Sequence, residues 1–366
     1  MSEEKKIRVL IVDDSAIARD MLEHGLSRDP EIAVVGKASD AFSARDKIVL
    51  MRPDVLTLDI EMPRMDGIEF LKRLLPQYPI PVVVVSAVTL EGSKRALEAL
   101  EAGAVDVVAK PDGGNREGLA HMLDDLAERV KEAANADVAK LNATRRGFRH
   151  HEQAQPKSAR IQAKNRATAG SGSRIIAIGA STGGTCVLNT LIPQFPEDIP
   201  GVVIVQHMPP VFTRMFAESL NRESRVEVRE AKDGDLVRPG LVLVAPGDFH
   251  LTVQRYGLEW RVECAPGDKV SGHRPSVDVL FNSVAQAAGE RAIGLILTGM
   301  GRDGADGLLA MRRSGARCFS QDEESSVVYG MPKEAWDNGA SERQLSVDNA
   351  TAALLTCVNA RIPVRS

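Results

Sequence analysis

RVLIVDD, residues 8–14, is the stretch that decides the fold of the first half of the chain. It is an apolar run that ends in two acids, and similar runs recur as EIAVVGKA (31–38), DVLTLDI (54–60), PVVVVSA (81–87) and AVDVVAK (104–110). Continuous rather than alternating apolar runs indicate strands that are buried on both faces, as in a parallel sheet between helix layers. Segments of helical period, such as 67–75 and 92–102, separate the runs. The pattern predicts an α/β domain over residues 5–125, a doubly wound five-stranded parallel sheet.

Polar residues cluster at the ends of these predicted strands: Asp13, Asp14, Asp59, Ser86 and Lys110. In a doubly wound sheet, functional residues collect beyond the carboxyl ends of the strands. Grouped carboxylates attract a hard divalent cation such as Mg²⁺, and another carboxylate can attack phosphorus as a nucleophile. Helix capping would explain Asp13 or Asp14 alone, but it explains the whole group poorly. The first domain is therefore predicted to accept a phosphoryl group.

Length and composition indicate two domains without an obvious membrane or nucleic-acid role. A chain of 366 residues is long for one domain, and its net charge of −4 does not favour nucleic acid as a partner. The longest apolar runs are too short to cross a bilayer, and MSEEKK lacks an apolar signal core, so a cytoplasmic location is expected. The widely spaced cysteines, Cys186, Cys264, Cys318 and Cys357, favour buried free thiols.

Residues 136–173 differ from the sequence on either side. They are rich in Lys and Arg, show weak apolar periodicity and close with ATAGSGS. We interpret them as a flexible basic linker, for which a solvated tether is favoured over a binding site for an anionic partner.

A second α/β pattern starts at residue 174 with RIIAIGA, PGVVIVQHM, GLVLVAP and RAIGLILTG, and 249–264 reads as an antiparallel hairpin. The first of these strands runs into Gly179-Ala180-Ser181-Thr182-Gly183, which fits G-x-S-x-G literally. Such a strand-to-helix turn exposes a serine hydroxyl, and the helix N-terminus offers N–H groups to an oxyanion. A glycine-rich turn could instead bind phosphate, but the GASTGG turn does not fit G-x-G-x-x-G, so that alternative ranks lower.

A nucleophilic serine needs a base, and histidine is the usual one. His207 follows a predicted strand and is favoured as the base. His273 lies in a polar loop, where a loop residue or a substrate contact is the alternative interpretation. His24, His121, His150, His151 and His250 have surface or linker contexts. Asp303, just past the last strand, could orient the imidazole, and Asp306 is its competitor, with a solvated or capping role as its default.

The motifs VDDS, LTLDIEMPRMDG, VVVVSA and AKP together resemble a response-regulator receiver domain, which has a flavodoxin-like fold. The resemblance implies that Asp59 is the phosphoacceptor and that Ser86 and Lys110 bind the phosphoryl group. It also implies that Mg²⁺ is held by Asp13, Asp14, Asp59 and the backbone carbonyl of Glu61. Receivers often carry Tyr or Phe where this chain has Val107, so the aromatic part of the receiver switch is in question.

The chain order Ser181, His207, Asp303 differs from the Ser, Asp, His order of α/β-hydrolases. With GASTGG, QHMPP, HRPSVDVLF and LTGMGRDGADG, it resembles the catalytic domain of chemotaxis protein-glutamate methylesterases over residues 174–357. A receiver, a linker and this domain form the architecture of that family.

The resemblance implies hydrolysis of glutamate γ-methyl esters on methyl-accepting chemoreceptors, and deamidation of receptor glutamines by the same acyl chemistry. The candidates for the oxyanion hole are backbone amides of Thr182, Gly183 and Met300. The implied partners are the chemoreceptors and a chemotaxis histidine kinase as phosphodonor, without nucleic acid or membrane insertion. The esterase reaction is expected to need no cofactor.

The same resemblance implies that the unphosphorylated receiver packs over the catalytic cleft and that phosphate on Asp59 loosens it. Two alternatives have different output modules. A transcription factor would need a DNA-binding module, which the long buried strands after residue 174 do not favour, and a partner-binding module without catalysis would not need the triad.

Overall fold

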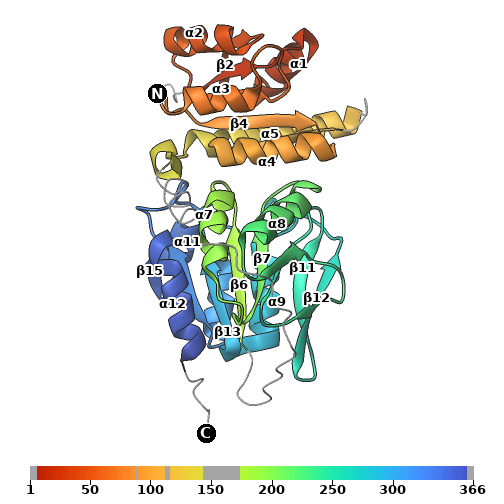
Figure 1. Cartoon of the computed structure of the whole chain (residues 1–366), viewed down its shortest axis with the longest axis vertical. Coiled ribbons are helices and arrows are strands. Elements are labelled where there is room, and N and C mark those ends of the chain that lie inside the picture. Colours follow the sequence, from red (N-terminus) through yellow and green to blue (C-terminus); the bar gives the residue numbers. More distant parts are fainter. Residues whose placement is uncertain (1–5, 88, 112–115, 143–173, 361–366) are drawn as a thin grey trace.

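The computed structural model describes residues 6–87, 89–111, 116–142 and 174–360. The first half forms a five-stranded parallel sheet in the order β2-β1-β3-β4-β5, which confirms the predicted fold (Figure 1). Its elements are β1 (Ile7–Val12), α1 (Ala16–Leu26), β2 (Ile32–Ala38), α2 (Ala41–Met51), β3 (Val55–Asp59), α3 (Gly67–Leu74), β4 (Val82–Ala87), α4 (Leu90–Ala102), β5 (Asp106–Lys110) and α5 (Arg116–Ala134). The last helix, α5, continues to Ala134, beyond residue 125, at which the predicted domain ended.

Local sequence signals explain where the helices of this domain begin. Ser15, Asp40 and Asp66 each precede a helix in extended backbone and accept hydrogen bonds from N–H groups of the first turn. Such caps satisfy donors that have no partner within the helix. Because β1 and β3 are parallel neighbours, the polar residues at their carboxyl ends meet at one edge of the sheet.

The second half forms a seven-stranded sheet in the order β15-β14-β13-β6-β7-β10-β8, in which every neighbouring pair is parallel. The predicted hairpin is present, and a short strand, β9, joins it to make a three-stranded antiparallel sheet. The elements are β6 (Ile175–Ala180), α7 (Gly184–Leu191), β7 (Gly201–Gln206), α8 (Phe212–Glu223), β8 (Glu227–Glu230), β9 (Leu236–Val237), β10 (Leu241–Val244), β11 (His250–Tyr256), β12 (Glu259–Ala265), α9 (Val277–Ala288), β13 (Ala292–Ile296), α10 (Ala305–Arg313), β14 (Arg317–Gln321), α11 (Met331–Asp337), β15 (Arg343–Leu345) and α12 (Val347–Asn359).

Alternate side chains of the central strands build two separate cores, which is the physical basis of the continuous apolar runs. Ile176 and Ile178 of β6 pack with α7, α8 and α12 on one face. Ile175 and Ala177 pack with α9, α10 and the antiparallel sheet on the other. Among the helices of the described residues, none is long and apolar enough to cross a membrane.

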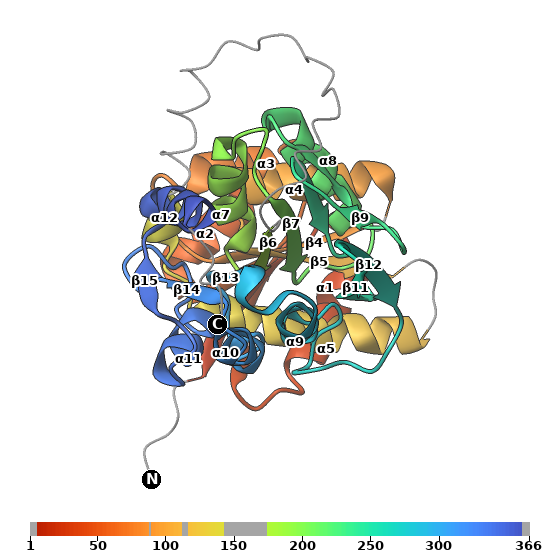
Figure 2. The ribbon, with the colours of Figure 1, turned by 90° about the horizontal axis from the view of Figure 1, so that it is seen from below.

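The two domains pack against each other through helices. The helices α4 and α5 lie between the first sheet and the second domain, with α7 and α8 facing them (Figures 1 and 2). A single buried apolar cluster includes Leu97 and Leu100 of α4, Val187 of α7 and Phe216 of α8, and α4 contacts both of these helices. The first domain therefore shares a core with the second.

The start of the predicted linker is ordered and packed, which corrects the flexible linker expected from residue 136. Residues 138–142 are helical, and Val138 and Leu141 are buried. The Asp137 N–H donates to the carbonyl of Val327 at 2.9 Å, and Lys140 Nζ donates to the carbonyl of Glu323 at 2.7 Å. The remainder of the predicted linker, 143–173, lies outside the described residues.

Candidate active site and phosphoacceptor site

Ser181 directly follows β6, at the centre of the seven-stranded sheet, where the strand order reverses direction. Its N–H donates to the carbonyl of Thr298 at 3.0 Å, and its own carbonyl accepts from the Gly184 N–H at 2.7 Å. Gly183 has φ +78°, and a Cβ there would lie 2.6 Å from Val327 Cβ. The turn therefore requires glycine at this position, and it presents Ser181 just before the N-terminus of α7.

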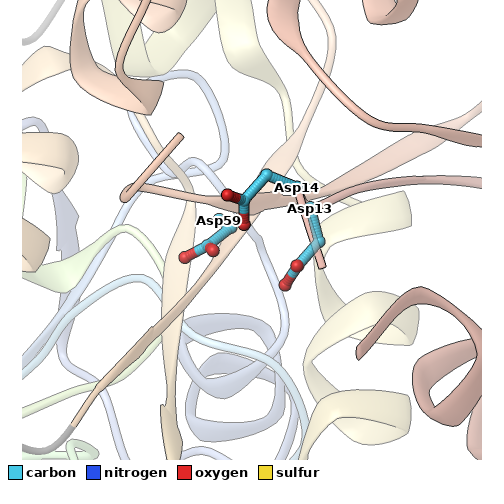
Figure 3. A group of neighbouring side chains, drawn as sticks. All are labelled: Asp13, Asp14 and Asp59. Carbon is cyan, nitrogen blue, oxygen red and sulfur yellow. The ribbon is translucent and has the colours of Figure 1, made fainter. Parts of the chain in front are cut away.

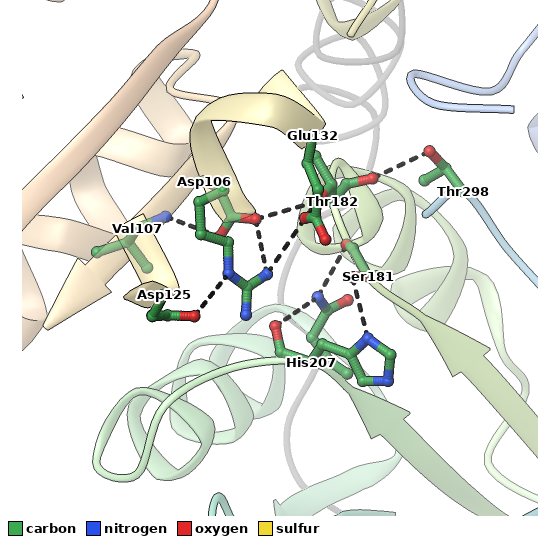
Figure 4. Close-up of polar contacts among 10 residues, drawn as sticks. Asp106, Val107, Asp125, Glu132, Ser181, Thr182, His207 and Thr298 are labelled. Atoms are coloured by element: carbon green, nitrogen blue, oxygen red, sulfur yellow. Dashed lines mark hydrogen bonds and ion pairs between the residues drawn. The ribbon is translucent and has the colours of Figure 1, made fainter. Parts of the chain in front are cut away.

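The structure brings Ser181, His207 and Asp303 together in one hydrogen-bonded line. His207 Nδ1 lies 3.1 Å from Ser181 Oγ, and His207 Nε2 lies 2.8 Å from Asp303 Oδ2. Figure 4 shows the His207 ring below the serine. Because an ionised carboxylate only accepts hydrogen bonds, Nε2 carries the proton and Nδ1 is left to accept one from the serine hydroxyl. The arrangement can therefore deprotonate Ser181.

Asp303 is anchored at the N-terminus of α9. Its carboxylate accepts bonds from Ser276 Oγ at 2.7 Å, from the Val277 N–H at 2.7 Å and from the Asp278 N–H at 3.1 Å. Burial would raise the pKa of this carboxyl, but the hydrogen bonds from His207, Ser276 and Val277 prevail and lower it to about 2. Asp303 is thus ionised throughout the ordinary pH range and can stabilise a charged imidazole.

The other candidates for the acid and the base are not part of the hydrogen-bonded triad, and one of them differs from the sequence interpretation. Asp306 is exposed in the first turn of α10 and pairs with Arg302 at 2.9 Å, as its default role predicts. His250, which the sequence placed on the surface, is buried: its Nε2 donates to the Asp268 carbonyl at 2.8 Å and its Nδ1 accepts from the Ser276 N–H. His273 stacks on His207 and takes no place in the hydrogen-bonded line of the triad.

Several residues that hold the site could not be singled out from the sequence. Gln206 Nε2 donates to the Ser181 carbonyl at 2.9 Å, and Thr298 Oγ1 donates to the Thr182 carbonyl at 3.0 Å. A Cβ on Gly299 would lie 2.7 Å from Ser181 Cβ, so the segment that leads to Met300 runs directly against the serine. Ser276 alone carried a signal, because serine before an apolar helical run is a helix cap.

The first domain reaches the second domain beside this serine. Thr182 Oγ1 lies 3.1 Å from Asp106 Oδ2 of β5 and 2.5 Å from Glu132 Oε2 of α5 (Figure 4). Arg129 of α5 joins the group, with Nη1 3.0 Å from Asp106 and Nε 3.4 Å from Asp125. Burial and the charge of Asp106 raise the pKa of Glu132 despite the nearby Arg129. The Thr182 hydroxyl is the donor within reach of both carboxylates.

The acidic cluster of the first domain is also assembled. Asp13, Asp14 and Asp59 each offer a carboxylate oxygen, and these atoms lie within 4.8 Å of one another (Figure 3). Lys110 Nζ lies 3.1 Å from Asp13 Oδ2 and 3.2 Å from Asp59 Oδ2. Burial, together with the Asp13 charge, raises the pKa of Asp59 in spite of Lys110. Because carboxylates that crowd one site disfavour each other's charge, the donor set fits a divalent cation such as Mg²⁺.

Two further positions, the predicted phosphoryl-binding Ser86 and the switch position Val107, are arranged differently from Lys110. The Ser86 hydroxyl donates to the Gly92 carbonyl at 3.1 Å, so it bonds to α4 rather than to the acidic cluster. Val107 is buried in β5, and its N–H donates to Asp106 Oδ1 at 2.7 Å. The residue in the place of the usual aromatic is therefore bonded to the carboxylate that reaches Thr182.

Comparison with known proteins assigns both domains to known families. Residues 9–124 match the response regulator receiver domain family, and residues 176–354 match the CheB methylesterase family. A protein-glutamate methylesterase/protein-glutamine glutaminase of Syntrophotalea carbinolica is 51% identical over 358 residues, 98% of this chain and 99% of the relative. The chain belongs to the protein-glutamate methylesterase/protein-glutamine glutaminase family.

Further relatives cover the whole chain or its second domain. A protein of Caulobacter vibrioides with the same name is 50% identical over 97% of this chain and 99% of its own length. The crystal structure of the Thermotoga maritima CheB methylesterase catalytic domain superposes with a TM-score of 0.50 and 37% identity, over 50% of this chain and 98% of that one. The relatives thus match both domains in sequence, and the solved catalytic domain shares the fold of the second domain.

Replacing Asp303 by asparagine is expected to slow the reaction of Ser181 with a fluorophosphonate probe by about 10⁴-fold, because the amide favours the wrong imidazole tautomer. Labelling rates are measured by mass spectrometry on full-length protein. Asp306→Asn, a matched change at an exposed neighbour, should label at the wild-type rate. Equal slowing in both variants would contradict the assignment of Asp303.

Proposed function

We propose that the chain is a phosphorylation-regulated serine esterase that hydrolyses glutamate γ-methyl esters on methyl-accepting chemoreceptors and deamidates receptor glutamines, and so resets receptor signalling in chemotaxis. The observation that carries the proposal is the Ser181–His207–Asp303 line, with distances of 3.1 and 2.8 Å, on a chain that also holds a receiver. The names of its full-length relatives support the substrate class. The parallel sheet of the second domain, instead of a DNA-binding module, favours this function over transcriptional control.

In the first half of the reaction, His207 Nδ1 accepts the proton of Ser181 as Oγ bonds to the ester carbonyl carbon. The carbonyl oxygen becomes an oxyanion, for which backbone N–H groups of Thr182, Gly183 and Met300 are the proposed donors. Asp303 stabilises the imidazolium. The imidazolium then protonates the departing methoxy oxygen, so methanol leaves and a glutamyl-serine ester remains.

In the second half, His207 takes a proton from water, and the hydroxide oxygen bonds to the same carbonyl carbon. The bond to Ser181 Oγ breaks, and the serine regains its proton from the imidazolium. The product is a glutamate carboxylate. A glutamine side chain follows the same sequence with ammonia as the first leaving group, so the two activities need one site and no cofactor.

The receiver site supports phosphorylation of Asp59 by a chemotaxis histidine kinase. Asp13, Asp14, Asp59 and the backbone carbonyl of Glu61 would hold Mg²⁺, which supplies charge neutralisation for phosphoryl transfer. Lys110, already paired with Asp59, would bind the phosphoryl group, and Ser86 would join it after leaving Gly92. The free state of all four cysteines suits a reducing cytoplasm.

The contact on Thr182 supplies the proposed gate. Asp106 and Glu132 bond to the residue next to the nucleophile, and they bury it beneath β5 and α5. Lys110 ends the strand that Asp106 begins. A phosphoryl group on Asp59 draws Lys110 toward new negative charge, so a shift of β5 would weaken the bonds to Thr182 and admit the receptor.

Ser181→Ala should lower methanol release from methylated receptor membranes by about 10⁶-fold, because the attacking oxygen is gone. Methanol release and the mass of the receptor peptides are measured together, with Asp306→Asn as the matched folding control. Methanol release by Ser181→Ala near the wild-type rate would rule out the serine mechanism.

A small-molecule phosphodonor with Mg²⁺ should raise the methanol-release rate of the full-length enzyme by about tenfold, within the usual range of coupling between sites. Asp59→Ala should lose this activation because it lacks the acceptor carboxylate. Asp46→Ala, a change at an exposed acid of α2, should keep it. Activation that survives in Asp59→Ala would place the regulatory phosphate elsewhere.

Glu132→Ala should raise the methanol-release rate of the unphosphorylated enzyme by about tenfold, because the gate loses its bond to Thr182. Glu128→Ala removes an exposed carboxylate from the same helix and should leave the rate unchanged. The comparison is made without phosphodonor. A Glu132→Ala rate equal to that of Glu128→Ala would contradict the gate.

A further inference from the structure

His273 lies face to face with the catalytic histidine. The ring centroids of His207 and His273 are 3.8 Å apart, and the ring planes differ by 14°. His273 comes from the loop before α9, whereas His207 follows β7. Two imidazoles from distant segments are therefore held nearly parallel at van der Waals contact.

The loop that carries His273 is rigidly mounted. Val270 and His273 exchange two backbone hydrogen bonds of 3.0 Å across a tight turn, in which Ser271 and Gly272 have φ +52° and +83°. Three residues later, Ser276 caps α9 and bonds to Asp303. The buried His250 ties the two ends of the loop by its bonds to Asp268 and Ser276.

The hydrogen bonds of the triad restrain one motion of His207 only weakly. Its two ring nitrogens are bonded, to Ser181 and to Asp303, and these two contacts define an axis through the ring. Rotation about that axis tilts the ring plane but keeps both nitrogens near their partners. The two hydrogen bonds therefore oppose the tilt only weakly. A parallel ring against one face opposes this tilt, and His273 occupies that face.

His273 is also suited to sit beside a ring that becomes charged. Burial and the positive fields of His207 and Arg129, opposed by Asp303, lower the pKa of His273 to about 2. His273 is therefore neutral in the working pH range. When His207 accepts the serine proton, it meets an uncharged aromatic face, which attracts a cation, and not a second positive charge.

We propose that His273 is a positioning residue for the esterase reaction, which holds the plane of the His207 imidazole by stacking and presents a neutral face to the imidazolium. The same loop supplies Ser276, which anchors Asp303, so one segment sets both the acid and the ring plane. The role rests on the proposed serine mechanism, but it does not depend on which ester is the substrate.

The test measures the rate at which a fluorophosphonate probe labels Ser181 between pH 5 and pH 9, in full-length His273→Phe, His273→Ala and His273→Lys proteins. This rate depends on His207 but not on a receptor, so failure of the receptor assignment leaves the test intact. Thermal melting shows which variants are folded.

Removing the ring in His273→Ala should slow labelling by about tenfold, the upper range for an aromatic pair, and His273→Phe should restore the rate to within about threefold of wild type. His273→Lys should move the acid limb of the pH–rate profile to lower pH, because a fixed positive charge disfavours the imidazolium. Folded His273→Phe as slow as His273→Ala would overturn the proposal, since the ring nitrogens and not the stacked face would then matter. A wild-type rate in His273→Ala, or a rate as low as in Ser181→Ala, would overturn it as well.

Discussion

The buried guanidinium of Arg129 organises the carboxylates through which the first domain contacts Thr182 of the second. It pairs with Asp106, Asp125 and Glu132, and the hydroxyl of Thr182 contacts two of these carboxylates, Asp106 and Glu132. Buried ions lose several kcal/mol of hydration each, and pairing only offsets this loss, so such a cluster contributes little net stability. Removing one partner, however, costs about 3–5 kcal/mol. An interface of this kind is therefore specific in its geometry.

The catalytic site differs from this interface, because hydrogen bonds hold its acid and its nucleophile in place without a substrate. Asp303 is held by three donors at the start of α9, and Ser181 is held by Thr298 and Gly184. Preorganised groups lower the barrier because they need not reorient during the reaction. The receiver therefore has no need to reshape the triad. In the proposed gate, covering Thr182 would be enough to keep a receptor from a site that is already assembled.

The sequence predicted both sheets and most of the site, because parallel strands bring their carboxyl ends to one edge. That rule alone placed Asp13 near Asp59, and Ser181 near His207. It could not reveal which nitrogen of His207 faces the serine, nor that His273 stacks on it, since both depend on side-chain rotation and on a loop far along the chain. The hydrogen bond between Thr182 and Glu132 could not be predicted from the sequence either, because the packing of one domain on another produces no periodic pattern of residues. The predicted surface position of His250 was wrong, because its burial follows from the packing of the loop before α9.

Hydrogen–deuterium exchange with and without a phosphodonor tests the central claim most directly, namely that the receiver covers an assembled catalytic site and is released by phosphorylation. The account predicts faster exchange on phosphorylation in α5 and in residues 181–191, while the hairpin β11–β12 exchanges at an unchanged rate. Unchanged exchange in residues 181–191, in a sample whose esterase rate has risen, would contradict it.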